Sequence, residues 1–122
     1  MNRLILDPIN FFNDLGDLHD AHINSMTWDA AAKSITIMVN DLNSNFQGLP
    51  EYKGKEQAYV LFIEVENLLF NCDALGGDTQ RIYALEMQKK ADSEKYECMM
   101  RIFPSGRLSF DCCSVEVAST AG

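Results

Sequence analysis

The sequence predicts a single α+β domain over residues 1–122, built mainly from an antiparallel β-sheet of about six strands in a meander with one short N-terminal helix. Three observations predict this fold. A chain of 122 residues is long enough to bury a hydrophobic core without disulfides or metals. Several runs alternate apolar and polar residues, which is the period of a half-buried strand. Segments rich in Gly, Pro, Asp and Ser separate most of these runs at hairpin spacing.

The one expected helix lies in the stretch DPINFFNDLG near the N-terminus. Asp7 is a candidate N-cap, Pro8 would occupy the first helical position, and Gly16 follows the expected end. The helix would have about two turns and would dock one apolar face on the sheet. The residues on that face would be Ile9, Phe12 and Leu15 or Phe11.

The six expected strands follow in chain order. A polar loop over 43–57 separates the second from the third, and the third reads as a central strand because it is apolar on both faces at its start. In the last strand the apolar phase slips near Cys113 and Ser114, which indicates a β-bulge. The strands cover residues 21–29, 34–42, 57–71, 81–90, 95–103 and 108–117, with turns at 29–33, 74–78 (ALGGD), 91–94 and 104–107 (PSGR).

Most aromatic residues lie within these strand patterns, so we expect them in the core. Trp28 is beside a turn, where half exposure is the alternative. Phe46, Leu49 and Tyr52 differ because they lie in the polar loop; they either tuck back onto the sheet or contact a partner. The aromatic residues expected in the core are Trp28, Phe62, Phe70, Tyr83, Phe103 and Phe110.

The charge distribution bears on the partners. The net charge is −8, and the whole excess lies in residues 1–80, which hold twelve acidic and four basic side chains, whereas residues 81–122 hold six of each. Such a surface repels nucleic acid and attracts a basic protein, although an acidic surface also simply maintains solubility. The longest apolar region, 58–70, is too short and too interrupted to cross a membrane, and the N-terminal stretch lacks a signal-peptide pattern. We therefore expect a cytoplasmic protein.

The four cysteines are expected to be reduced and mostly structural. Cys72, Cys98, Cys112 and Cys113 do not have the paired spacing of zinc ligands, and neighbours such as Cys112 and Cys113 point to opposite faces of a strand. The sequence therefore predicts no cofactor.

The stretch LHDAHI, residues 18–23, is the most suggestive chemically. His19 and His22, with Asp17 and Asp20 nearby, are the only metal-ligand candidates, but on an extended strand the two histidines would point to opposite faces. Asp20 could instead tune His19 for acid–base catalysis, yet no activated nucleophile or phosphate-binding loop accompanies them. The interpretation we favour is structural: His19 and Asp20 hydrogen-bond backbone where the helix leads into the first strand.

The order of HDA-x-I before a strand, a WD turn, the strand ITIMV and a late CSVEV resembles small bacterial β-rich families of unassigned function. It is similar in particular to immunity-type proteins of polymorphic toxin systems, some of which carry HDAE where His22 stands here. The resemblance implies a non-enzymatic protein that binds and neutralises a cognate toxin, and an acidic face would suit a basic one. The alternative is a small metal-binding protein or hydrolase-like enzyme centred on His19 and His22. An exposed edge strand could also pair two copies into a homodimer.

Overall fold

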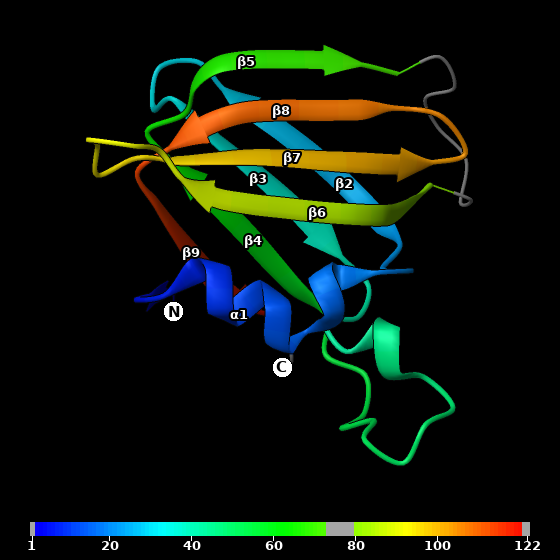
Figure 1. The fold of residues 1–122 in the computed structure, drawn as a ribbon. Coiled ribbons are helices and arrows are strands. Elements are labelled where there is room, and N and C mark those ends of the chain that lie inside the picture. The colour runs from blue at the N-terminus through cyan, green and yellow to red at the C-terminus, as the bar shows by residue number, and fades with distance from the viewer. Residues whose placement is uncertain (1, 73–79, 121–122) are drawn as a thin grey trace.

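Two antiparallel β-sheets pack face to face in a computed structural model, which describes residues 2–72 and 80–120, and a short helix lies along one side (Figure 1). The helix is α1 (Pro8–Asp14), and two 3-10 turns, η1 (Gly16–Leu18) and η2 (Ser44–Phe46), follow it. The strands are β1 (Arg3–Ile5), β2 (Ile23–Asp29), β3 (Ser34–Val39), β4 (Ala58–Ile63), β5 (Glu66–Asn71), β6 (Arg81–Lys89), β7 (Tyr96–Phe103), β8 (Arg107–Cys112) and β9 (Ser114–Ser119).

The antiparallel, β-rich fold with one N-terminal helix is confirmed, but the strand count is not. The described residues form nine strands rather than about six, in a five-stranded sheet of order β1-β9-β4-β3-β2 and a four-stranded sheet of order β5-β8-β7-β6. We call these sheet A and sheet B. The expected meander holds within β2-β3-β4 and within β6-β7-β8, whereas β9 inserts between β1 and β4, and β5 pairs with β8. The central position expected for the third strand is that of β4.

Two strands expected to be continuous instead cross from one sheet to the other at a shared corner. The run over 57–71 divides into β4 and β5 because Glu64 adopts a left-handed φ of 54°, which ends β4. The phase slip near Cys113 marks the return crossing from β8 to β9 and is more than a bulge. The two crossings lie side by side, since the Cys113 N–H donates to the Ile63 carbonyl at 2.9 Å. Strands that switch sheets in this way form the corners of a sandwich.

A second corner joins the sheets through the segment that precedes β2. The Asp20 N–H donates to the Ile82 carbonyl at 2.9 Å, the Ile82 N–H donates to Ala21 at 2.9 Å, and the Ile23 N–H donates to Gln80 at 3.0 Å. An isolated antiparallel bridge between His22 and Arg81 continues this pairing. Residues 20–23 thus pair alongside the first residues of β6, at the edge of sheet B, and lead directly into β2 of sheet A.

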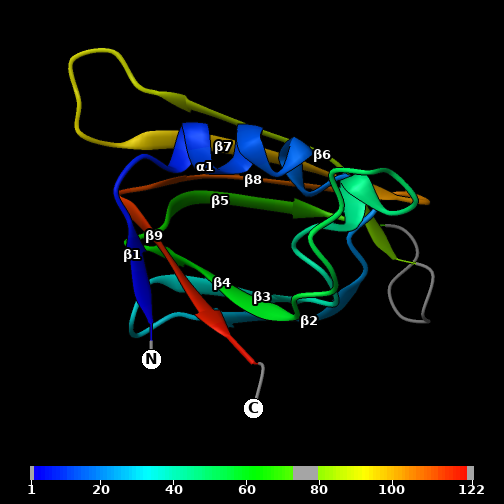
Figure 2. The same cartoon turned by 90° about the horizontal axis from the view of Figure 1, so that it is seen from below.

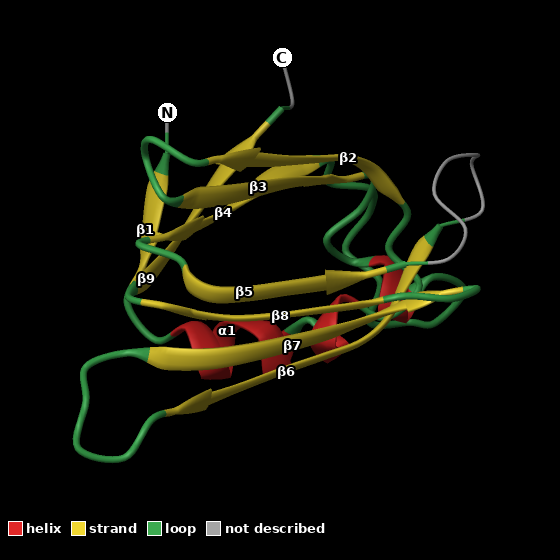
Figure 3. Cartoon of the chain, turned by 90° about the horizontal axis from the view of Figure 1, so that it is seen from above, coloured by secondary structure: helices red, strands yellow, loops and turns green. Residues whose placement is uncertain are grey.

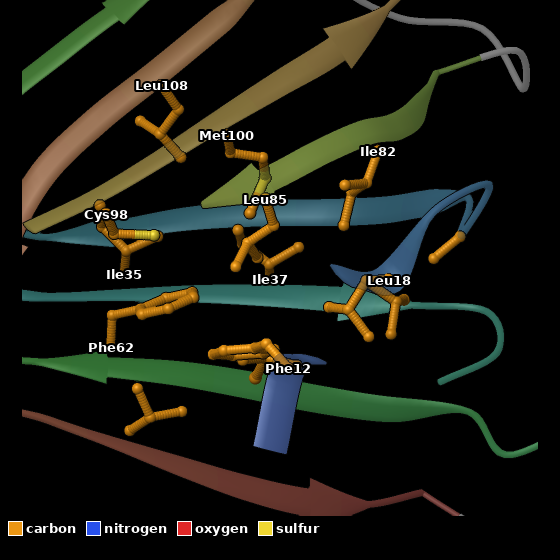
Figure 4. Close-up of a cluster of buried hydrophobic side chains, with 14 of the residues drawn as sticks. Phe12, Leu18, Ile35, Ile37, Phe62, Ile82, Leu85, Cys98, Met100 and Leu108 are labelled. Atoms are coloured by element: carbon orange, nitrogen blue, oxygen red, sulfur yellow. The ribbon is translucent and has the colours of Figure 1, made fainter. Parts of the chain in front are cut away.

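The core fills the space between the sheets with alternating strand residues (Figure 4). Phe62 of β4 lies at its centre: its ring is 4.9 Å from that of Phe110 on β8 and 6.2 Å from that of Phe12 on α1. Such aromatic pairs add to the stabilisation that burial itself supplies. The side chains from the predicted alternation in β3, Ile35, Ile37 and Val39, are all buried.

The helix α1 closes one long side of the sandwich, next to β6 (Figure 2). Asp7 is the N-cap, with its Oδ1 accepting from the Asn10 N–H at 3.2 Å, and Pro8 opens the helix as expected. Phe12 projects between the sheets with 1% of its surface exposed. Gly16 is required just beyond the helix because its φ is 65° and an added Cβ would lie 2.1 Å from the amide nitrogen of Asn45.

Four of the six aromatic residues expected in the core are not fully buried there. Phe62 and Phe110 are buried, but Phe70, Tyr83 and Phe103 are 40%, 57% and 44% exposed, and Trp28 shows the half exposure considered for it. These residues follow a strand period, but they lie on edge strands or on the outer face of sheet B. The opposite sheet does not cover side chains at these positions. The turn expected over 74–78 lies outside the described residues. No helix among the described residues is long and apolar enough to cross a membrane.

Candidate functional site

Acidic side chains gather on the segment that closes the helix side of the sandwich. Residues 4–32 contain five aspartates and no Lys or Arg. Three of these, Asp7, Asp14 and Asp17, flank or belong to α1 and η1, and Asp20 follows at the corner. Together with Glu86 on the adjacent β6, these four aspartates define what we call the acidic face.

A hollow of about 260 Å³ opens in the acidic face between α1, β6 and β7. Of the described residues that line it, three are acidic, Asp17, Glu86 and Glu97, and none is basic. Burial, and then the negative charge of Glu86, raise the pKa of Asp17 above its usual value. The rest of the lining is mostly aliphatic or thioether: Ile9, Leu85, Met87 and Met99, with the amides of Asn13 and Gln88.

The hollow therefore combines carboxylates with an apolar lining. A lysine or arginine side chain has the complementary construction, a cationic head on an aliphatic stem. Glu97 already accepts a hydrogen bond from Gln88 Nε2 at 2.9 Å, which holds one carboxylate in place.

On the opposite long side of the sandwich the edge strands β5 and β2 face each other (Figure 3). A larger cleft of about 660 Å³ opens there. Its walls come from both sheets and are mainly apolar. Trp28 and Phe70 line it while 45% and 40% exposed. A large apolar pocket with a few polar groups at its margin is the usual form of a ligand site. The apolar lining residues are Ile23, Met26, Trp28, Leu68, Phe70 and Ile102.

His19 and Asp20 lie at the junction between η1 and β2, where the structural interpretation placed them. His19 Nδ1 lies 2.7 Å from the Tyr83 carbonyl oxygen, so that nitrogen carries the proton and donates. His19 Nε2 is 3.6 Å from Asp20 Oδ2, and the imidazole packs edge-on against the Tyr83 ring at 5.7 Å. Asp20 has a left-handed φ of 69°, and its backbone N–H donates to the Ile82 carbonyl on β6. Both residues thus contact β6 at the second corner.

His22 does not join His19 in a site. Its N–H donates to Asn40 Oδ1 at 2.7 Å, and its backbone bridges to Arg81. Among the described residues, no group of three or more His, Cys, Asp or Glu side chains is placed to hold a metal ion, so Asp17, His19 and His22 do not form the metal site considered for them. Asp17 belongs to the acidic hollow instead.

The loop aromatic Tyr52 tucks back onto the domain. Its hydroxyl donates to Asp41 Oδ2 at 2.6 Å, and Asp41 also accepts from the backbone N–H groups of Asn43 and Glu56 at 2.9 and 3.0 Å and from Gln47 Nε2 at 3.3 Å. Desolvation acts to raise the pKa of the fully buried Asp41, but these hydrogen bonds outweigh it and hold the pKa below its usual value.

The other two loop residues differ from Tyr52. Leu49 is 49% exposed, and Phe46 is partly buried, as Tyr52 is, but its ring has no hydroxyl to form a hydrogen bond of the kind that holds Tyr52. The buried Asp41 anchor was not recognised in the sequence. The only signal for it was an aspartate that directly follows an apolar strand and opens a long loop.

All four cysteines are free thiols, as expected. Burial raises the pKa of the Cys98 thiol, and burial followed by the charges of its neighbours raises that of Cys112 to about 12. Both thiols are therefore protonated at neutral pH and pack as small apolar groups.

Comparison with known proteins assigns no relative. No protein-family model matches the chain, and no curated protein sequence matches it significantly. The two surfaces of the domain that offer a binding site are the acidic hollow and the apolar cleft. The sequence did not identify four of the lining residues as site residues, because their place in a lining depends on which elements meet across the sandwich. They are Glu86 and Glu97 in the hollow and Leu68 and Phe70 in the cleft.

Proposed function

We propose that this protein is a non-enzymatic binding module whose acidic face receives a basic protein. The observation that carries the proposal is the hollow lined by Asp17, Glu86 and Glu97, to which the described part of the chain contributes no basic side chain. The pKa of Asp17 is raised first by burial and then by the charge of Glu86, and a bound cation would relieve the repulsion between the two carboxylates. A Lys or Arg of the partner would place its charge among the carboxylates and its stem against Ile9 and Met87.

An immunity-type role is the specific form of this proposal that the HDA-x-I resemblance implies. The partner would then be a basic toxin, and the protein would neutralise it by occupying a basic surface. The aliphatic lining of the hollow supports recognition of individual side chains, because long-range attraction alone raises the association rate more than the affinity. A general acidic surface that merely keeps the protein soluble would require no such hollow.

The test compares two variants that remove the same net charge. Asp17→Asn with Glu86→Gln neutralises the hollow, whereas Asp92→Asn with Glu94→Gln neutralises two carboxylates of the β6–β7 loop, where Glu94 is 96% exposed. Binding of a fluorescent arginine- and leucine-containing peptide is measured by anisotropy. We expect about tenfold weaker binding for the hollow variant and less than about twofold for the loop variant.

Equal losses in the two variants would mean that only net charge attracts the peptide, and the proposed site would be wrong. For the immunity-type role, the protein is co-expressed with any large secreted protein encoded beside it. Growth rescued by the wild type and by the loop variant, but not by the hollow variant, would support that role. The absence of such a neighbouring gene, or equal rescue by both variants, would count against it.

A further inference from the structure

The apolar cleft between β5 and β2 is not needed for binding through the acidic face, because it lies on the opposite long side of the sandwich (Figures 1 and 3). Its walls are two β-sheets, whose backbones in a packed pair are about 10 Å apart. An α-helix with its side chains is about 10–12 Å in diameter and would not fit between them. The occupant must therefore be thin. A volume of about 660 Å³ is that of a pocket for a small organic molecule.

The lining of the cleft also restricts the charge of its occupant. All ten of the described residues that line it are uncharged, in a chain with 18 acidic and 10 basic side chains. Burying an ion there would leave its charge uncompensated, which is strongly unfavourable. Polar groups are still present: Asn24 and Ser25 on β2 can exchange one or two hydrogen bonds with a ligand. The lining thus fits a neutral molecule.

The helix side of the same sandwich shows what kind of group occupies the space between the sheets. There the Phe12 ring enters from α1 and stacks on Phe62 at 6.2 Å with an interplanar angle of 22°. On the cleft side the aromatic and thioether groups, Trp28, Phe70 and Met26, are on the walls, and no described segment supplies a ring between them. Aromatic and sulfur contacts both favour an aromatic occupant.

We propose that the cleft binds a compact, neutral, aromatic small molecule held against Trp28 and Phe70. Trp28 is the only tryptophan in the chain, so its fluorescence reports directly on the occupancy of the cleft. The probe is N-phenyl-1-naphthylamine, a neutral aromatic amine that accepts excitation energy from tryptophan. Saturable 1:1 binding with energy transfer from Trp28 is expected.

Two neighbouring leucines on β5 provide a matched pair of variants. Leu68 lines the cleft, whereas Leu69 is turned to the outer face of sheet B, where it borders a separate hollow with Arg101 and Arg107. Leu68→Asp should weaken probe binding at least about tenfold, and Leu69→Asp should leave it unchanged. Equal effects of the two variants, or no saturable binding by the wild type, would overturn the proposal.

A second pair keeps the test decisive if Leu68→Asp does not fold. Phe70→Ala and Phe103→Ala remove rings of similar exposure, 40% and 44%, but only Phe70 lines the cleft. Only Phe70→Ala should weaken binding of the neutral probe.

Two further measurements separate other occupants. The anionic relative 8-anilinonaphthalene-1-sulfonate should bind more weakly than the neutral probe, and tighter binding would contradict a neutral ligand. Sedimentation equilibrium tests whether a second copy covers the cleft instead. A dimer that dissociates in Leu68→Asp but not in Leu69→Asp would assign the cleft to a homodimer contact and overturn the proposal.

Discussion

The two long sides of the sandwich lie between the same pair of sheets, but a helix covers only one of them among the described residues. On the helix side, α1 places Phe12 and η1 places Leu18 between the sheets, and each is only 1% exposed. On the cleft side, Trp28 and Phe70 are 45% and 40% exposed. The comparison teaches that an apolar aromatic residue in a strand or helix has no fixed role: a covering segment makes it core, and the lack of one makes it available for binding.

Removing one aromatic ring from each side tests this difference most strongly. Phe12→Ala should lower the free energy of unfolding by about 3–5 kcal/mol, because it deletes a fully buried ring that stacks on Phe62. Phe70→Ala should lower it by less than about 1.5 kcal/mol, because the ring is partly exposed already. Urea denaturation followed by circular dichroism measures both. Similar losses would mean that the cleft side is as much a part of the core as the helix side.

The loop that supports the helix side gives the next largest effect. Asp41 anchors residues 41–57, and Ser44 in this loop donates to the His19 carbonyl at 2.9 Å. Asp41→Asn should lower the free energy of unfolding by about 2–3 kcal/mol, because buried hydrogen bonds to a charged carboxylate are lost. Probe binding in the cleft should be unchanged. Weaker probe binding in this variant would show that the two sides are coupled.

The same residue sets a pH dependence. Its folded-state pKa is lowered relative to the unfolded chain, so its stabilisation is present above the unfolded pKa, near 4, and is lost as the pH falls through the folded pKa. Asp111 behaves alike: desolvation opposes the shift, but hydrogen bonds from Lys90 at 2.8 Å and Asn67 at 2.7 Å lower its pKa. Unfolding curves should therefore show stability falling below about pH 5. Asp41→Asn should make this fall shallower, and an unchanged slope would contradict the assigned role.

Replacing His19, at the corner beside the helix side, should have a smaller effect on the free energy of unfolding. His19→Ala should lower the free energy of unfolding by about 1 kcal/mol, because it removes the hydrogen bond to the Tyr83 carbonyl and one ring contact. Thermal melts with and without chelator measure it. A variant with unchanged stability, or a wild-type melt that falls with chelator, would favour the alternative of a metal-binding or catalytic histidine.

The smallest expected effect is a gain. Burial, and then the charge of Glu86, raise the pKa of Asp17. The repulsion between the two carboxylates is unfavourable at neutral pH and disappears as the pH falls through the folded-state pKa of Asp17. Glu86→Gln should therefore raise the free energy of unfolding by up to about 0.5 kcal/mol at pH 7 and by nothing at pH 3. A gain that persists at pH 3 would show that repulsion within the hollow is not its cause.

Local patterns predicted much of the fold but little of the candidate sites. The Asp7 cap with Pro8 predicted α1, and the alternation of Ile35, Ile37 and Val39 predicted β3, because both signals act within a few residues. The division of 57–71 into β4 and β5 was not predicted, since Glu64 carries no signature for a left-handed φ. The hollow and the cleft were missed for another reason: their linings join α1 to β6 and β2 to β5, which are far apart in the chain.

The sequence by itself determined the antiparallel β-rich class, the short capped helix, the reduced cysteines and the acidic character of the N-terminal part, because these follow from local periodicity, capping chemistry and composition. The tertiary structure alone decided that the chain forms two sheets and that α1 covers one long side of the sandwich. It also decided that no described segment covers Trp28 and Phe70 on the other long side. The physical reason is that burial depends on which elements meet across the sandwich, and a strand pattern shows only that a residue has an apolar face to offer.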